Sequence, residues 1–149
     1  MVDLNLLKKL REETQASVSD CRKALEETSG DYKKALEWLK KKGIEKAKEK
    51  QDRETKEGLI ESYIHQNGKV GSMVELLCET DFVAKTDEFK NLAHEIAMQV
   101  AAMSPKDTKE LLKQEYIRDS SQTVDGLIKS IIAKLGENIS VKRFERFEI

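Results

Sequence analysis

Residues 70–85 read VGSMVELLCETDFVAK, and the pattern changes at residue 79. The first nine residues are rich in apolar side chains at even spacing, which is typical of a strand with one buried face. That face would carry Val70, Val74, Leu76 and Cys78. Helical spacing resumes near Thr86, so the segment Thr80–Lys85 is expected to lie at a corner between a strand and a helix.

An acid and a large aromatic side chain, Asp81 and Phe82, are neighbours at this corner. Burial stabilises apolar side chains, so Phe82 could simply fold back into the core. Alternatively, the ring and the carboxylate project together toward a partner, because binding residues concentrate on loops held by rigid elements. The sequence alone leaves both interpretations open.

Two further segments predict partners for the 70–78 strand. Residues 59–65 are rich in β-forming side chains and are followed by Asn67-Gly68, a strong signal for a hairpin with a two-residue turn. Residues 139–149 alternate apolar and charged side chains, as expected of a half-buried strand. We therefore expect a three-stranded antiparallel sheet. Its last strand, or its apolar face, is a possible surface for homodimerisation, since uncovered sheet edges favour pairing.

Helices are expected to cover this sheet. Apolar residues recur at helical spacing from Phe89 to Val100, and Ser104-Pro105 would end that helix. Residues 107–117 and 124–135 are predicted as two more helices, the second ending at Gly136. The fold class is therefore α+β: helices packed on a three-stranded antiparallel sheet.

The first 43 residues predict a compact bundle of three helices. Asp3 and Asp31 are suitable caps for the first and third helices, the second would begin near Ser17 or Ser19, and Gly43 would end the third. Residues 45–56 are almost entirely charged or polar, which favours a solvated linker. The predicted domains are a three-helix domain at 1–44, a linker at 45–56 and an α+β core at 57–149.

The composition excludes several classes of protein. Charged residues make up 37% of the chain and its net charge is −1, so no global field favours nucleic acid. The sequence contains neither phosphate-binding glycine loops nor the His/Cys spacing of a metal site. We expect no enzyme activity, no cofactor and no bound metal. The two cysteines and the lack of a long apolar span predict a cytoplasmic protein with free thiols and no membrane segment.

Four blocks of sequence closely resemble the elongation factor Ts family, in a short form. Their order is kept across nearly the whole chain. The blocks are residues 10–25 (LREETQASVSDCRKAL), 30–43 (GDYKKALEWLKKKG), 78–85 (CETDFVAK) and 135–139 (LGENI). The resemblance implies a ubiquitin-associated-like N-terminal domain and a guanine-nucleotide exchange factor that binds elongation factor Tu·GDP.

The resemblance also implies roles for individual residues. It assigns Thr80, Asp81, Phe82 and Val83 to dislodging the GTPase's Mg²⁺, so that GDP leaves and GTP can bind. Arg11 matches a partner-binding arginine, Val18 and Ser19 stand where the family has two methionines, and Lys85 completes the 80–85 motif. The family's second core repeat and coiled-coil insertion are absent, and short relatives are thought to dimerise.

Two other functions stay open at this point. A three-helix domain can serve as an adaptor for other folded proteins, although that function leaves the 80–85 corner unexplained. The lysines of residues 33–56 could instead bind RNA or the ribosome, in which case the affinity should fall steeply with added salt.

Overall fold

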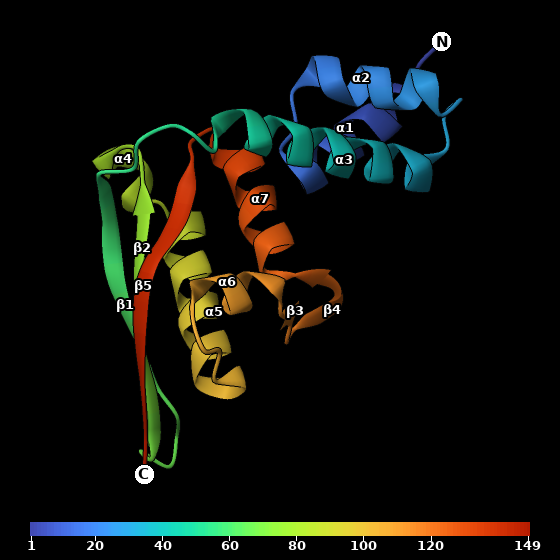
Figure 1. Ribbon diagram of the computed structural model, residues 1–149. Coiled ribbons are helices and arrows are strands. Elements are labelled where there is room, and N and C mark those ends of the chain that lie inside the picture. The colour runs from blue at the N-terminus through green and yellow to red at the C-terminus, as the bar shows by residue number, and fades with distance from the viewer.

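The computed structural model describes residues 1–149 and contains a helical N-terminal part followed by a mixed α/β part. In Figure 1 the first helices lie at the upper right, and a three-stranded sheet covered by helices occupies the rest of the molecule. The predicted α+β class, with three N-terminal helices and a three-stranded antiparallel sheet, is confirmed.

The N-terminal bundle consists of α1 (Leu4–Thr14), α2 (Val18–Glu27) and the first half of α3 (Tyr32–Lys50). Asp3, Ser17 and Asp31 cap the three helices, each accepting backbone N–H groups that would otherwise have no partner. The buried side chains of the bundle are Leu10, Cys21, Ala24, Leu25, Ala35 and Leu39. Leu4 does not join them and is 70% exposed.

The third helix does not end where the sequence suggests. Gly43 is a predicted stop, but α3 continues through it to Lys50, so this prediction is wrong. The second half of α3 packs on another helix, α7 (Val124–Leu135), and Ala47 is buried in the core of the α/β part. Residues 45–50 of the expected linker are therefore helical, and 51–56 lead into the sheet. The division into two domains stays a prediction.

The sheet has the order β1-β2-β5, and both strand pairs are antiparallel. Its strands are β1 (Glu57–Ile64), β2 (Val70–Cys78) and β5 (Ile139–Glu148). The β1–β2 connection is longer than the expected two-residue turn, because His65 N–H bonds to Val70 C=O across four residues. Gly68 (φ 70°) supplies the left-handed conformation that this loop needs.

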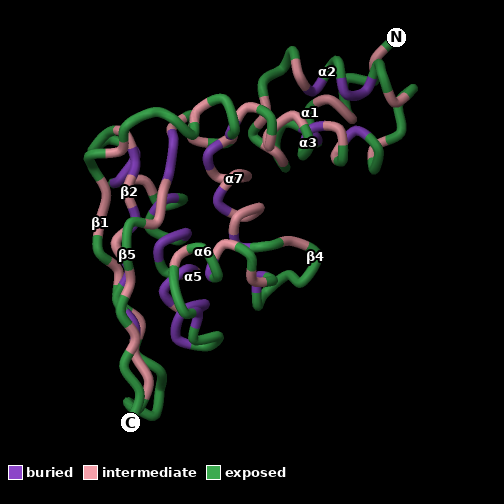
Figure 2. Tube along the Cα trace, in the orientation of Figure 1, coloured by how far each residue is buried: buried purple, intermediate pink, exposed green.

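The helices α5 (Asp87–Met103), α6 (Thr108–Lys113) and α7 lie on one face of the sheet (Figure 1). The longest is α5, capped by Thr86 and ended by Ser104. Together with α7 it buries the core side chains of β2, including Val74, Leu76 and Cys78. In Figure 2 the buried residues of the α/β part lie mainly along α5, α7 and the strands that face them.

The segment between α5 and α7 differs from the single helix predicted for residues 107–117. It forms a short helix, α6 (Thr108–Lys113), and a small hairpin of β3 (Glu115–Tyr116) and β4 (Asp119–Thr123). The buried Gln99 of α5 explains the change of structure. Its side-chain amide donates to the Glu115 carbonyl and accepts from the Ile117 N–H, which holds the chain extended there.

The other face of the sheet is uncovered. Four large apolar side chains project from it, each at least half exposed: Ile60, Ile64, Met73 and Phe147. Among them lies Glu75, paired with Arg143 at 3.5 Å, and its second carboxylate oxygen is buried without a hydrogen-bond partner. None of the helices has the length and apolar character needed to cross a lipid bilayer.

Candidate functional site

The corner after β2 is a single turn of helix, α4 (Asp81–Ala84). Thr80 is its N-cap: the backbone is extended there, and the hydroxyl accepts the Val83 N–H at 3.3 Å. Thr86 begins α5 immediately afterwards and donates its own hydroxyl to the Val83 carbonyl at 2.7 Å. The chain therefore turns from strand to helix in eight residues, with a side-chain cap at each step.

This one turn separates its side chains into two sets. Val83 and Ala84 are 6% and 5% exposed and belong to the main core cluster. Phe82 is 83% exposed, so the alternative in which its ring folds into the core is wrong. An aromatic side chain left in water forgoes the roughly 1.5–3 kcal/mol that burial would supply. A single exposed apolar side chain is common on protein surfaces, but this one lies on a turn held between a strand and a helix, where binding residues concentrate.

Asp81 lies beside Phe82 at the start of α4 and is also exposed. Its carboxylate forms an ion pair with Lys85 at 2.8 Å, four residues along the chain. The hydrogen bond and charge of Asp81 raise the pKa of the Lys85 ammonium. The corner thus presents one ring, one carboxylate and one ammonium within five residues.

A glutamate from a distant part of the chain holds this corner. The carboxylate of Glu137, in the turn before β5, accepts the Glu79 and Thr80 N–H groups at 3.2 and 2.9 Å. Its other oxygen accepts the Thr80 hydroxyl at 2.7 Å. All three bonds end on the residues that lead into α4, so Glu137 fixes where that turn begins.

The turn before β5 also donates a hydrogen bond to the corner. The carboxylate of Glu79 accepts the Asn138 N–H at 3.0 Å and lies 3.7 Å from the guanidinium of Arg53. Asn138 is 7% exposed, and its amide donates to the carbonyls of Gln51 and Arg53. Because Gln51 is the C-cap of α3, this cluster joins the end of α3 to the corner.

The thiol of Cys78 lies directly under the corner. It donates to the Thr80 carbonyl at 3.1 Å. Burial, reinforced by the charge of Glu137, raises the pKa of this thiol to about 11. Cys78 and the buried Cys21 are both free thiols, and Cys78 is therefore a packed apolar group rather than a nucleophile.

The other predicted partner-binding residues lie on the bundle. Arg11 lies in the last turn of α1, while Val18 and Ser19 begin α2, and all three are exposed. They flank the α1–α2 turn, which borders a groove of about 660 Å³ between that turn, α3 and α7. The structure therefore groups the predicted residues in two sets: Thr80 to Lys85 at the corner, and Arg11, Val18 and Ser19 on the bundle. In Figure 1, α4 lies at the upper left, and α1 and α2 lie at the upper right.

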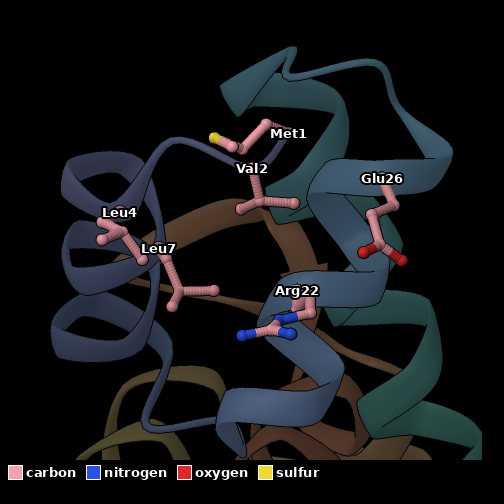
Figure 3. A pocket seen from close by; sticks show the side chains of 6 residues that line it. All are labelled: Met1, Val2, Leu4, Leu7, Arg22 and Glu26. Atoms are coloured by element: carbon pink, nitrogen blue, oxygen red, sulfur yellow. The ribbon is translucent and has the colours of Figure 1, made fainter.

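A small cavity of about 260 Å³ opens at the other end of the α1–α2 pair. Figure 3 shows Leu4 and Leu7 of α1 facing Arg22 and Glu26 of α2, with Met1 and Val2 beside them. It is shallow and mostly apolar, and the sequence pattern did not indicate it.

Glu137 and Asn138 are the residues at the corner that sequence reasoning from periodicity missed. They belong to the 135–139 block, but nothing in the pattern of that block shows which side chains it contacts. No group of three or more His, Cys, Asp or Glu side chains is close enough together to hold a metal ion.

Comparison with known proteins gives a consistent result. Residues 79–149 match the sequence profile of a family described as elongation factor TS. The chain is 44% identical to elongation factor Ts of Thermotoga neapolitana over 191 aligned positions, which cover 99% of this chain and 97% of that protein. It is 42% identical to the protein of the same name from Fervidobacterium nodosum, covering 99% and 98%. The corresponding Nostoc protein is 47% identical over 99% of this chain, which spans about half of that longer relative.

Proposed function

The chain belongs to the elongation factor Ts family and is a translation elongation factor, and on that premise we propose that it is a guanine-nucleotide exchange factor for elongation factor Tu. It binds the GDP-loaded GTPase, dislodges Mg²⁺ and promotes GDP release so that GTP can bind. It changes a binding equilibrium of its partner and catalyses no covalent step, so it is not an enzyme. Its place of action is the cytoplasm, where translation occurs.

The single observation that carries this proposal is the exposure of Phe82. Its ring is 83% exposed, while the next two residues of the same turn are buried in the core. Val83 and Ala84 therefore anchor the inner side of the turn in the core. In the proposed complex Phe82 inserts between helices of the GTPase, and Thr80, Asp81 and Val83 complete the surface that displaces the metal.

The physical mechanism follows from how such a GTPase holds its nucleotide. Backbone amides, a lysine and a bridging Mg²⁺ bind the phosphates of GDP. An exchange factor needs only to bind the metal-free or empty GTPase better than the loaded one, because coupling between two ligands is reciprocal. The Asp81 carboxylate perturbs the polar surroundings of the metal, and loss of the cation leaves the phosphate charge uncompensated.

The required free energy indicates more than one contact. A ~10⁴-fold shift in nucleotide affinity needs about 5.5 kcal/mol of differential binding. Burial of one phenylalanine supplies roughly 1.5–3 kcal/mol. We assign the remaining contact to the bundle, with Arg11, Val18 and Ser19 as its contact residues and Lys85 as an additional one at the corner. The predicted domains at 1–44 and 57–149 then act as two binding units.

The uncovered face of the sheet supports a second element of the proposal, homodimerisation. The four exposed apolar side chains on β1, β2 and β5 form a patch that a second copy would cover.

One experiment tests the exchange proposal directly. Elongation factor Tu is loaded with a fluorescent GDP analogue and chased with excess GTP, with and without this chain. We expect the chain to accelerate release in proportion to its concentration until saturation. Release at the intrinsic rate at every concentration would contradict the proposal. Binding to RNA that falls steeply with salt would instead favour the nucleic-acid alternative.

A further inference from the structure

Glu137 lies 57 residues from Thr80 in the sequence, yet its carboxylate accepts three hydrogen bonds from the residues that lead into α4. We propose that Glu137 is a positioning residue for nucleotide exchange: it holds the start of α4 so that Phe82 projects at a fixed angle toward the partner. This inference rests on the proposed exchange function and adds to it a residue outside the 80–85 motif.

The length of α4 explains why such a residue is needed. A helix of four residues, Asp81–Ala84, closes hardly more than one hydrogen-bonded turn and is unstable by itself. Val83 and Ala84 anchor its inner side in the core. The exposed side, which carries Phe82, has no such packing, and its direction depends on the backbone at Glu79 and Thr80. Glu137 is the side chain that fixes both of those N–H groups.

The bonds made by Glu137 also have the properties expected of a positioning contact. A carboxylate that accepts N–H and O–H groups makes charge-assisted hydrogen bonds, which are shorter and stronger than neutral ones. The Thr80 hydroxyl donates to Glu137 and accepts from the Val83 N–H, so it joins the glutamate to the interior of α4. A shift of Glu137 would therefore move the whole turn rather than one side chain.

The neighbouring residue extends this support to the bundle. Asn138 donates to the carbonyls of Gln51 and Arg53, just beyond α3, and its own N–H donates to Glu79. The end of α3 and the start of α4 are thus attached to two consecutive residues. Glu137 and Asn138 therefore hold the bundle and the corner in a constant relative position. Such a fixed arrangement is needed if both are to contact one partner at the same time.

The test compares Glu137→Ala, Glu137→Gln and a control, Glu49→Ala, at an exposed glutamate of α3 for which no hydrogen bond or ion pair is found. The GDP-release assay is run over a range of factor concentrations, which separates the saturating rate from the half-saturating concentration. Hydrogen exchange of the Glu79 and Thr80 amides in the free protein gives a second readout that does not involve the partner.

We expect Glu137→Ala to lower the saturating rate about tenfold, since misplacement of a functional group by about 1 Å can cost up to ~100-fold. The half-saturating concentration should change less than about twofold, because the bundle contacts are intact. The Glu79 and Thr80 amides should lose protection. Glu137→Gln should restore most of the rate, because its carbonyl oxygen can still accept both N–H groups. Glu49→Ala should match the wild type.

Three outcomes would overturn the inference. In the first, Glu137→Ala keeps the saturating rate of the wild type. In the second, Glu137→Ala raises only the half-saturating concentration. In the third, its Glu79 and Thr80 amides stay as protected as before. A wild-type chain that fails to accelerate GDP release would overturn the proposed function as well, whereas an active wild type with an equally active Glu137→Ala would overturn this inference alone.

Discussion

Gly43 of α3 packs directly against Ala133 of α7, so closely that a Cβ on Gly43 would lie 3.2 Å from the Cβ of Ala133. The contact lies where the N-terminal bundle meets the α/β part. Glycine is a weak helix former, with a cost of about 1 kcal/mol relative to alanine. Its presence in the middle of α3 is explained by the close approach of the two helices.

This contact predicts that Gly43→Leu destabilises the chain. A leucine side chain has no room between α3 and α7 and would force them apart, at a cost of about 1–3 kcal/mol typical of an overpacked core. Urea unfolding followed by circular dichroism measures the change. Lys41→Leu, at an exposed position two residues earlier, is the control and should be close to neutral. Equal stability of the two variants would show that α3 and α7 are loosely packed at Gly43.

The two phenylalanines near the corner predict opposite effects on stability and on exchange. Phe82 is 83% exposed, whereas Phe89, on α5, is fully buried. Phe82→Ala should change the free energy of unfolding by no more than about 0.5 kcal/mol, yet slow GDP release strongly. Phe89→Ala should cost about 3–5 kcal/mol through the cavity it leaves. Unfolding curves and the release assay on both variants test this. Normal release with Phe82→Ala would remove the ring from the mechanism.

The uncovered face of the sheet predicts a dimer that a single charge disrupts. Met73 is 53% exposed at the centre of that face, and Met103, at the end of α5, is 49% exposed. We expect the wild type to sediment as a dimer at tens of micromolar. Met73→Glu should raise the dissociation constant at least about tenfold, because an unpaired charge in an apolar interface is costly. Met103→Glu should still dimerise. A wild type that sediments only as a monomer would refute the dimer.

The ion pair between Asp20 of α2 and Lys46 of α3 predicts a pH-dependent contribution to stability. The hydrogen bond from Lys46 lowers the pKa of the Asp20 carboxyl below its ordinary value of 3.8. A lowered pKa in the folded state stabilises the fold above pH 3.8, and this stabilisation is lost as the pH falls through the lowered pKa. Asp20→Asn should therefore cost about 1 kcal/mol at pH 7 and progressively less below pH 3.8.

Urea unfolding from pH 7 to pH 2 measures this difference. Asp52→Asn serves as the control, since that carboxylate is exposed and forms no ion pair. A cost for Asp20→Asn that stays constant over the whole pH range would contradict an electrostatic origin. It would point instead to a change in side-chain packing or hydrogen bonding that does not depend on the charge of the carboxylate.

Much of the fold could be predicted because local signals and burial agree. The caps Asp3 and Asp31, and the alternation of residues 139–149, each indicate one structure from neighbouring residues alone, whereas Ser17 and Ser19 were both candidates for the start of α2. Gly43 misled because a glycine can mark a helix end or a close contact, and only the position of α7 distinguishes the two. The β3–β4 hairpin was missed because it depends on Gln99, which lies some 16 residues earlier and bonds to its backbone.

The candidate site divides in the same way. The Thr80–Lys85 corner could be predicted, because the spacing of apolar residues changes from that of a strand to that of a helix after Cys78. The contribution of Glu137 is a contact over 57 residues, and no local pattern encodes it. Whether Phe82 faces water or the core was also beyond the sequence, since both outcomes fit an apolar residue at the end of a strand.

The uninterrupted course of α3 has a consequence for affinity. A helix of 19 residues is about 28 Å long and does not bend freely. Folding already determines the distance between its two ends. The conformational entropy of the segment that joins them is therefore lost on folding and not on binding. A partner that engages both ends therefore gains the second contact with little further entropic cost.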